Sequence, residues 1–316
     1  MKIALLFPGQ GSQSVGMGKD FYDNFKEVRI YYEKAESILG YDIKKIIFEG
    51  SQELLMQTEY TQPSVFLTSY IIFEIFKNKI PQIMQNVKFV AGHSLGEYTA
   101  VCVSSALNFE QTLSLVNIRA KIMADAGKNK SGGMLAVLGV TRDELKNYCD
   151  EIKKLGFIVE PVNFNTPQQI VVAGEVEGIN KLYNLLSEKK IKSIKLNVSG
   201  AFHSSLMNDA QKIFSQTLDK IDINNALTPI VMNYDAKPHI EKKEILENLK
   251  LQINHPVLWE DSIKYIAEND VEIFIELGPG KVLSGMVKRI IPDVKVFNID
   301  NLDNLFTTID SLKQFF

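Results

Sequence analysis

The stretch Val87 to Leu107, "VKFVAGHSLGEYTAVCVSSAL", joins two different patterns through a short turn. It begins as an apolar strand-like run that ends at Ala91 or Gly92, and from Leu95 onward it has a helical pattern. Between the two lies Gly-His-Ser-Leu-Gly, with Ser94 at its centre. A strand, a tight turn with small residues and a helix are the context that a nucleophile elbow requires. A glycine-lined turn with a capping serine would have the same pattern, so the rest of the chain must decide.

Strand-like runs occur within this stretch and on both sides of it. They are "IALLF" (3–7), "VKFVAG" (87–92), "VEIFIEL" (271–277) and "VKVFNI" (294–299). Helical patterns separate them, such as 61–77, where apolar residues recur at three- and four-residue spacing. Alternation of strands and helices predicts an α/β fold with a mainly parallel sheet.

One segment in the middle of the chain has a different order of elements. It follows the loop-like run "GKNKSGG" (127–133), and Thr141 with Glu144 forms a capping-box pattern at its first helix. The order strand, helix, strand, strand, helix, strand is that of the ferredoxin-like βαββαβ unit. We therefore expect a small subdomain, 130–197, inserted into a larger domain formed by 1–129 and 198–316. The expected elements are a strand at 134–140, a helix at 141–153, a strand at 157–164, a turn at 165–167, a strand at 169–174, a helix at 176–189 and a strand at 191–197.

The composition excludes several classes of function. The 316 residues carry a net charge of −3 with mixed signs throughout, which argues against nucleic acid as a ligand. No stretch approaches the roughly 20 apolar residues that span a bilayer, and Pro8 ends the first apolar run too early for a signal peptide. Two cysteines, Cys102 and Cys149, are too few for a disulfide framework, which fits a reducing cytoplasm. A plastid-type organelle is the alternative if a targeting peptide has been removed. The sequence has no metal-ligand spacing.

A serine nucleophile needs a base, and the chain has four histidines. His93 is adjacent to Ser94 and should point away from it, whereas His239 and His255 lie beside prolines and should be surface residues. His203 follows a strand run and precedes an amphipathic segment. At a helix N-terminus the dipole would keep its ring neutral, so we expect His203 to act as the base. Capping of the helix is the alternative role.

Arg119 lies on the apolar side of the helical pattern 109–126. At 100° per residue its side chain projects roughly 160° away from that of Lys121, which belongs to the polar face. A guanidinium on an apolar face must find an anion or a polar pocket, and its planar fork suits a carboxylate. The sequence therefore predicts either a carboxylate-binding residue or a structural ion pair with an internal Asp or Glu.

Two main-chain N–H groups are candidates for an oxyanion hole. Leu95 follows Ser94 at the start of a helix, where free N–H groups are available. The loop "FPGQGSQSVGMGKD" (7–20) fits neither a P-loop nor a dinucleotide-binding fingerprint, because Ser14 stands where the last glycine would be. This loop can still lend the N–H of Gln10 to a nearby site.

Seven stretches along the chain, together with Arg119, resemble one family, the malonyl-CoA:acyl carrier protein transacylases of fatty acid synthesis, which are related to polyketide synthase acyltransferase domains. The resemblance implies a hydrolase-like α/β core with an inserted ferredoxin-like subdomain. The matching stretches are "FPGQGSQ" (7–13), "GHSLGEY" (92–98), Arg119, "GGMLAVLG" (132–139), "NFNTPQQIVVAG" (163–174), "SGAFHSSLM" (199–207), "QINHPVLW" (252–259) and "ELGPGKVLSGMVKR" (276–289).

The resemblance implies a ping-pong transfer of a malonyl group from malonyl-CoA to the phosphopantetheine thiol of acyl carrier protein. Ser94 would carry the malonyl ester with His203 as base, and the N–H groups of Gln10 and Leu95 would bind the oxyanion. Arg119 would hold the malonyl carboxylate in a bidentate pair. It further implies that the main-chain carbonyl near Gln252 orients the imidazole, with Gln252 and Asn163 as substrate-binding positions, and the "GAFH" motif resembles that of malonyl-selective enzymes.

The family resemblance also sets the expected partners. They are acyl carrier protein and malonyl-CoA, with no cofactor, metal, membrane or nucleic acid, and we expect a monomer. A serine hydrolase or thioesterase of similar fold is one alternative, although such enzymes carry their histidine nearer the C-terminus than His203. A polyketide-type acyltransferase and a non-catalytic carrier-protein or acyl-CoA binding module are the others. Lys189, Lys190, Lys192 and Lys195, or Lys281, Lys288 and Arg289, could form a basic docking patch or a solvated face.

Overall fold

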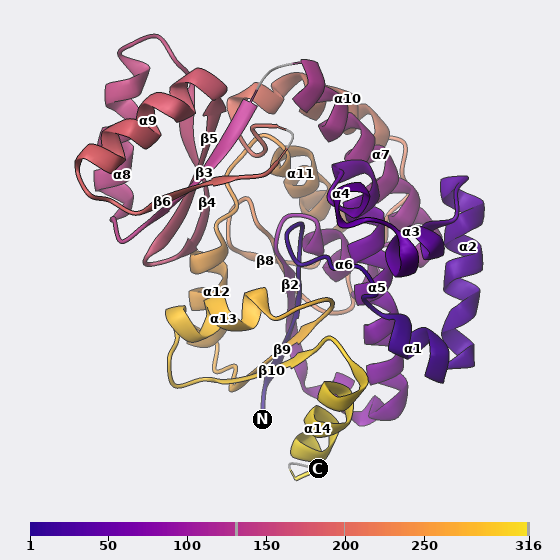
Figure 1. Ribbon diagram of the computed structural model, residues 1–316. Coiled ribbons are helices and arrows are strands. Elements are labelled where there is room, and N and C mark those ends of the chain that lie inside the picture. Colours follow the sequence, from indigo (N-terminus) through magenta and orange to yellow (C-terminus); the bar gives the residue numbers. More distant parts are fainter. Residues whose placement is uncertain (130–131, 199, 315–316) are drawn as a thin grey trace.

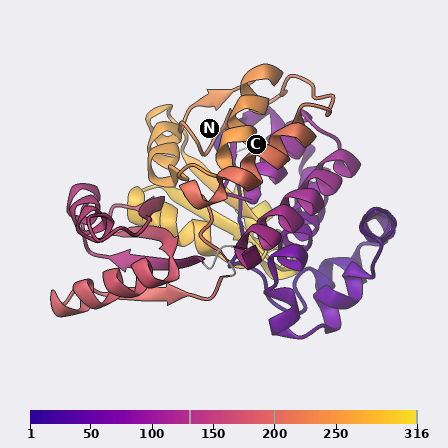
Figure 2. The same ribbon diagram turned by 90° about the horizontal axis from the view of Figure 1, so that it is seen from above.

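The computed structural model describes residues 1–129, 132–198 and 200–314 of the protein. Its chain folds around two sheets, and Figures 1 and 2 show the smaller one standing to one side of the larger body. The first part of the chain contains β1 (Ile3–Phe7), α1 (Lys19–Asn24), α2 (Arg29–Leu39), α3 (Ile43–Glu49), α4 (Gln52–Leu55), α5 (Thr58–Lys79), β2 (Val87–Gly92), α6 (Gly96–Val103) and α7 (Phe109–Asn129).

The middle of the chain forms β3 (Gly132–Leu138), α8 (Arg142–Lys153), β4 (Val159–Thr166), β5 (Gln169–Glu175), α9 (Val176–Glu188) and β6 (Ser193–Leu196). The last part forms α10 (Asn208–Leu218), β7 (Ile230–Val231), β8 (Pro238–His239), α11 (Lys242–Gln252), α12 (Trp259–Glu268), β9 (Ile273–Leu277), α13 (Val282–Ile290), β10 (Lys295–Ile299) and α14 (Leu302–Lys313). Short 3₁₀ helices lie at η1 (Lys26–Val28), η2 (Pro81–Asn86) and η3 (Ser205–Met207).

The larger sheet has the strand order β10-β9-β1-β2-β7-β8, and all its pairs are parallel except β7 with β8. In a parallel sheet the loops that follow the carboxyl ends of the strands meet at one edge, where α/β folds bind their ligands. Phe7 pairs with Gly92 at the ends of β1 and β2, so the loops that begin at Pro8 and His93 lie side by side. This edge carries the candidate site.

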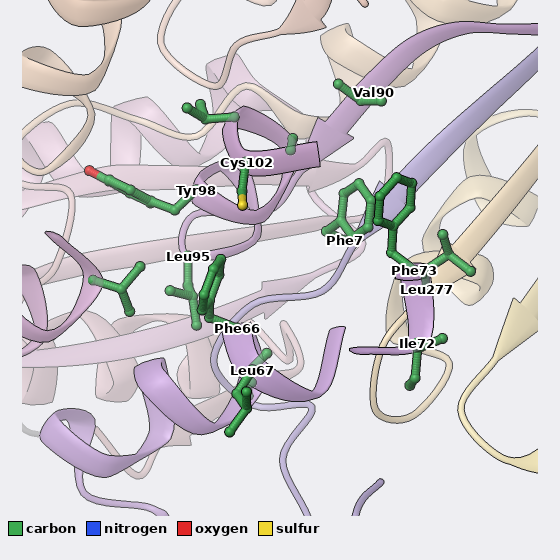
Figure 3. Packing of buried hydrophobic residues seen from close by; sticks show 14 of the residues in the cluster. Phe7, Phe66, Leu67, Ile72, Phe73, Val90, Leu95, Tyr98, Cys102 and Leu277 are labelled. Carbon is green, nitrogen blue, oxygen red and sulfur yellow. The ribbon is translucent and has the colours of Figure 1, made fainter. Parts of the chain in front are cut away.

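The two faces of the larger sheet bury alternate residues of β1, as the period-two geometry of a strand requires. Ile3, Leu5 and Phe7 pack with α5, α6 and α7 in one hydrophobic cluster. Figure 3 shows the centre of this cluster, where the rings of Phe7 and Phe73 lie edge to face at a centroid distance of 6.3 Å. Ala4 and Leu6 face the opposite side, with residues of α12 and α13. The sheet is therefore covered on both faces, which is typical of parallel sheets.

The smaller sheet is antiparallel, with the order β4-β5-β3-β6. Helices α8 and α9 cover one face and bury Leu135 and Val137 of β3. Met134 and Ala136 of the same strand belong instead to the core cluster of the larger body. The connectivity and strand order are those of a βαββαβ unit.

The predicted α/β class, with a mainly parallel sheet and a separate βαββαβ unit, is confirmed. The capping box of Thr141 and Glu144 is also present at the start of α8. The domain boundaries 1–129, 130–197 and 198–316 stay a prediction.

Two local predictions were wrong. The predicted turn at 165–167 lies later, at 167–168, because β4 extends to Thr166. The stretch 127–133 is not a loop throughout, since α7 continues to Asn129 and Gly132 already pairs with Glu175 in β3 and β5. Only residues 130 and 131 of that stretch lie outside the described residues.

Candidate active site

Ser94 lies on a sharp turn between β2 and α6, and the backbone around it explains the two glycines of the motif. Its φ angle is 51°, in the left-handed region that side chains other than glycine rarely adopt. A Cβ on Gly92 would lie 1.9 Å from the carbonyl carbon of Gly96, and a Cβ on Gly96 would lie 1.9 Å from the oxygen of Phe7. Glycine is therefore required at both positions because the turn packs directly against itself and against β1.

His203 faces Ser94 from the segment before η3. Its Nε2 lies 2.8 Å from the Ser94 hydroxyl oxygen, and its Nδ1 lies 2.8 Å from the main-chain oxygen of Gln252. A carbonyl oxygen can only accept, so the Nδ1 atom carries the proton and Nε2 has a free lone pair toward Ser94. The main-chain N–H of His203 donates to the oxygen of Ile253, which fixes the segment. The arrangement is a serine with an oriented base.

The His203 imidazole is kept neutral by burial and not by a helix dipole. Only 4% of the residue is exposed, and desolvation together with the nearby Arg119 guanidinium lowers the pKa of His203 to about 3. The expected cause was wrong, because η3 separates His203 from the first turn of α10. The expected consequence holds, since a neutral ring can accept a proton from Ser94.

Arg119 extends from α7 into the same site and is fully buried. Its Nη1 donates to the side-chain oxygen of Gln62 at 2.6 Å. Its Nη2 donates to the side-chain oxygen of Gln252 at 2.9 Å and to the Ser94 hydroxyl at 3.1 Å. The guanidinium also lies over the Tyr98 ring, 5.0 Å from its centroid.

No carboxylate forms an ion pair with Arg119 within the part of the chain that the structure describes. The structural ion pair weighed as an alternative is therefore absent there. Burial lowers the pKa of Arg119, since burying a cation is costly, although the nearby Tyr98 and Glu97 act in the opposite direction without forming an ion pair. The site thus presents a positive charge that a carboxylate ligand would satisfy.

Gln10 and Leu95 both line the cavity beside Ser94. In the turn, the Ser94 N–H donates to Asn233, the Gly96 N–H to His93 and the Glu97 N–H to Ser94. Among the described residues this pattern leaves the N–H of Leu95 without an intramolecular acceptor. Close contact of the two loops is possible because Gly9 packs against the His93 carbonyl, where a Cβ would lie 2.3 Å from its oxygen.

The cavity has a volume of about 180 Å³ and brings the candidates together. Ser94, His203 and Arg119 line it, as does Asn163 of β4 in the smaller sheet. Gln252 lies behind this wall, where only 1% of the residue is exposed. The remaining wall is mostly apolar and comes from α7, from the smaller sheet and the segment after it, and from α13: Met123, Met134, Val171, Leu196, Val198, Phe202, Val282, Leu283 and Met286.

The other histidines are not bases for Ser94, but two of them are less exposed than expected. His93 bonds to the Asn165 side chain at 2.8 Å, in agreement with the prediction that it points away from Ser94. His239 and His255 are half-buried and not surface residues. His239 is held between Asp235 and Glu244, and His255 bonds to the Leu251 carbonyl, so each is occupied by local partners. No cluster of three or more potential metal ligands occurs among the described residues.

Three side chains at the site escaped the sequence analysis. Asn233 accepts from the Ser94 N–H at 2.7 Å and donates to the Gly92 oxygen at 2.7 Å, which braces the turn. Gln62 contacts Arg119 from α5, and Glu97 lies buried in the first turn of α6. Of these three, only Glu97 could have been recognised from the sequence, because a carboxylate within an apolar helical run needs a hydrogen-bonding partner.

Comparison with known proteins bears directly on this site. Residues 4–299 match the family described as acyl transferase domain. A malonyl CoA-acyl carrier protein transacylase of Bacillus subtilis (strain 168) is 38% identical over 316 residues, covering 99% of this chain and 98% of that protein. The chain belongs to the family of malonyl CoA-acyl carrier protein transacylases. It is an acyltransferase.

Solved structures of the family have the same fold. The malonyl CoA-acyl carrier protein transacylase of Clostridium perfringens superimposes on this acyltransferase with a TM-score of 0.92, at 36% identity, covering 100% of this chain and 98% of that one. A malonyl-transacylase solved in complex with a type II PKS acyl-carrier protein gives a TM-score of 0.93 at 32% identity, with coverage of 98% and 100%. Within the described residues of this acyltransferase, no helix is long and apolar enough to cross a membrane.

Proposed function

We propose that this acyltransferase moves a malonyl group from malonyl-CoA to the phosphopantetheine thiol of acyl carrier protein, by a ping-pong reaction through a malonyl ester on Ser94, in fatty acid biosynthesis. The observation that carries the proposal is the contact of Ser94 with both His203 and Arg119 inside one cavity. The first contact supplies a base and the second supplies a binding group for a carboxylate. The names of the relatives, which refer to malonyl CoA and acyl carrier protein, support the same substrates.

In the first half-reaction the Ser94 oxygen attacks the thioester carbonyl carbon while His203 Nε2 takes the hydroxyl proton. The tetrahedral intermediate carries its negative oxygen toward the N–H groups of Gln10 and Leu95. The carbon–sulfur bond then breaks, and the proton passes from His203 to the departing sulfur of CoA. The Nδ1 contact with the Gln252 carbonyl stabilises the transient imidazolium in the required orientation.

In the second half-reaction the carrier-protein thiol takes the place of CoA. His203 accepts the thiol proton as the sulfur attacks the malonyl ester, and it returns the proton to the Ser94 oxygen when the ester bond breaks. Asn163 lines the cavity from the smaller sheet and is proposed as a substrate contact. No step needs a cofactor or a metal.

Arg119 is proposed to pair with the free malonyl carboxylate. Its contact with Ser94 places the guanidinium beside the atom that carries the acyl group, as a three-carbon diacid requires. Pairing would also offset the positive charge that lowers the pKa of His203, since Arg119 is one of the causes of that shift. The carboxylate of the substrate therefore strengthens the base that activates Ser94.

Surface charge suggests where acyl carrier protein docks, and the two cysteines suggest the cellular compartment. Acyl carrier proteins are acidic, and Lys281, Lys288 and Arg289 are exposed on or beside α13, a helix whose residues also line the cavity. We propose this cluster as the docking surface, since it lies next to the acceptor's route to Ser94. Cys102 and Cys149 are free and buried, which fits the reducing cytoplasm proposed from the sequence.

Intact-mass measurement after mixing with malonyl-CoA tests the covalent step. Wild-type protein should gain one malonyl group, and Ser94→Ala should gain none. Addition of phosphopantetheinylated acyl carrier protein should discharge the adduct much faster than buffer alone. Faster loss to water than to carrier protein would instead identify a hydrolase. No adduct on the wild type would refute the serine intermediate.

A further inference from the structure

Glu97 is a buried carboxylate that the proposed reaction does not use. It lies in the first turn of α6, three residues after Ser94, and none of its surface is exposed. A buried carboxylate is costly unless several donors satisfy it, so its partners show what it does.

Two donors hold the Glu97 carboxylate, one on each oxygen. The main-chain N–H of Asn233 donates to Oε1 at 2.7 Å, and Nε2 of the Gln252 side chain donates to Oε2. These two partners also hold the nucleophile turn, since the Asn233 side chain accepts from the Ser94 N–H and Gln252 Nε2 donates to the main-chain oxygen of Ser94 at 2.7 Å. Glu97 therefore joins the supports on both sides of Ser94.

Gln252 is the central residue of this network. Its side-chain nitrogen contacts Glu97 and the Ser94 oxygen, while its side-chain oxygen accepts from Arg119 at 2.9 Å. Its main-chain oxygen accepts from His203. One residue thus touches the nucleophile, the base and the carboxylate-binding arginine.

An amide group has a donor end and an acceptor end of nearly the same shape, so its neighbours decide its orientation. Arg119 requires the oxygen of Gln252 on its side, and the Glu97 carboxylate, which accepts only, requires the nitrogen on the other. The charge state of Glu97 matters here because a protonated oxygen would itself be a donor.

The hydrogen bonds of Glu97 are those of its ionised form, although burial favours the neutral form. Both of its oxygens face donors, Arg119 is close, and the positive end of the α6 dipole surrounds its first turn. Burial is the largest influence and raises the pKa of Glu97 to about 8, whereas the donors from Asn233 and Gln252 and the charge of Arg119 act in the opposite direction. Both oxygens accept hydrogen bonds in the structure, so the arrangement described here is that of the ionised carboxylate. Asp235 acts with burial, and Tyr98 and His203 are further titratable side chains near Arg119.

We propose that Glu97 is a positioning residue for acyl transfer, whose carboxylate orients the Gln252 amide so that its oxygen faces Arg119 and its nitrogen holds the Ser94 turn. This inference rests on the proposed function. It predicts that Glu97 controls the preference for malonyl over acetyl although it touches neither substrate.

Glu97→Gln tests the orientation with almost no change in volume. The new amide oxygen can still accept from Asn233, but the new NH₂ group then faces the NH₂ group of Gln252. Either two donors oppose each other or the Gln252 amide turns over and presents a donor to Arg119. We expect kcat/KM for malonyl-CoA to fall by up to about 100-fold, the scale of a 1 Å misplacement at a reacting group. The malonyl-to-acetyl ratio should fall at least roughly tenfold.

Controls separate orientation from simple space filling. Glu260→Gln changes another buried carboxylate, which pairs with Arg142 and Lys264 away from Ser94. This variant should keep kcat/KM for malonyl-CoA and the malonyl-to-acetyl ratio within about threefold of wild type. In a Gln252→Leu variant there is no side-chain amide for Glu97 to orient, so adding Glu97→Gln should lower kcat/KM for malonyl-CoA by less than about a further threefold.

Three results would overturn the inference. They are wild-type kinetics in Glu97→Gln, parallel loss of malonyl and acetyl transfer with a lowered melting temperature, and an equal effect of Glu97→Gln with or without Gln252. Absence of malonyl transfer in the wild type would instead refute the proposed function, and this inference with it. A normal wild type with an unaffected variant refutes this inference alone.

Discussion

Replacing Arg119 with Met removes the buried charge while keeping most of the side-chain volume. In the native protein the guanidinium holds Gln62, Gln252 and the Ser94 hydroxyl, and it lowers the pKa of His203. A malonyl group in the variant must bury its carboxylate without a cation. An acetyl group has no such carboxylate, and the His203 beside it becomes a stronger base. The substitution should therefore change the two substrates in opposite directions.

The size of the effect follows from the loss of one partner of a buried ion pair. Such a loss costs about 3–5 kcal/mol, and each 1.4 kcal/mol is a factor of ten. Malonyl transfer should therefore fall by roughly two to four decades relative to acetyl transfer. The oxygens of Gln62 and Gln252 also lose a donor, at about 1–3 kcal/mol each, which opposes the relief of removing a buried cation.

The assay is formation of the acyl-enzyme from malonyl-CoA and from acetyl-CoA, measured by rapid mixing and intact mass, with thermal unfolding of each variant. Arg142→Met is the matched control, because Arg142 bridges α8 to Glu260 and Asp261 and does not line the cavity. It should change neither rate by more than about threefold. Equal loss of both acyl transfers in Arg119→Met, in a protein that unfolds normally, would refute the carboxylate role.

Two further predictions concern the base and the turn. Because the pKa of His203 lies at about 3, below its usual value of about 6.5, the unfolded chain takes up the proton first as the pH falls. The free energy of unfolding should thus decline between about pH 6.5 and 3 more steeply in wild type than in His203→Gln, by up to about 1.4 kcal/mol per pH unit. Denaturant titrations at pH 7 and 4.5 would measure the decline. An equal decline in both proteins would contradict the low pKa of His203. Gly92→Ala and Gly96→Ala should abolish the malonyl adduct and lower the unfolding midpoint, because the added Cβ would lie 1.9 Å from backbone atoms. Gly285→Ala is the control: it has open space around it in α13 and should stabilise the protein by about 0.5–1 kcal/mol. An unfolding midpoint in Gly96→Ala equal to that of the wild type would contradict the packing argument.

Local patterns in the sequence predicted most of the fold and the three central side chains. Strands β1, β2 and β9 are mainly apolar runs, and the buried face of α7 is visible in its periodicity, so Ser94 and Arg119 could be placed correctly. Strands β7 and β8 have only two residues each, which is too short for a pattern, and Asn233 follows β7. The role of Asn233 depends on β7 lying beside β2, a pairing that no local pattern encodes.

The difference between local and long-range information also explains why the neutral state of His203 was predicted correctly but its cause was not. A dipole argument uses only neighbours in sequence, whereas burial and the charge of Arg119 come from distant segments that meet in the fold. Sequence analysis could select His203 as the histidine that contacts Ser94, but the environment that sets the pKa of its imidazole depends on the tertiary structure.

Both residues proposed to react have backbones in the left-handed region, Ser94 at a φ of 51° and His203 at 64°. Such conformations cost of order 1–3 kcal/mol each and persist only where the surroundings enforce them. For Ser94 the enforcing contacts come from Asn233 and Gln252, and for His203 from the Ile253 carbonyl. The segment after His203 is also held by the smaller sheet, since the Ser205 N–H and hydroxyl both donate to Glu160 of β4. The smaller sheet therefore contributes more than a wall of the cavity, because it helps to hold His203 Nε2 at 2.8 Å from the Ser94 hydroxyl oxygen.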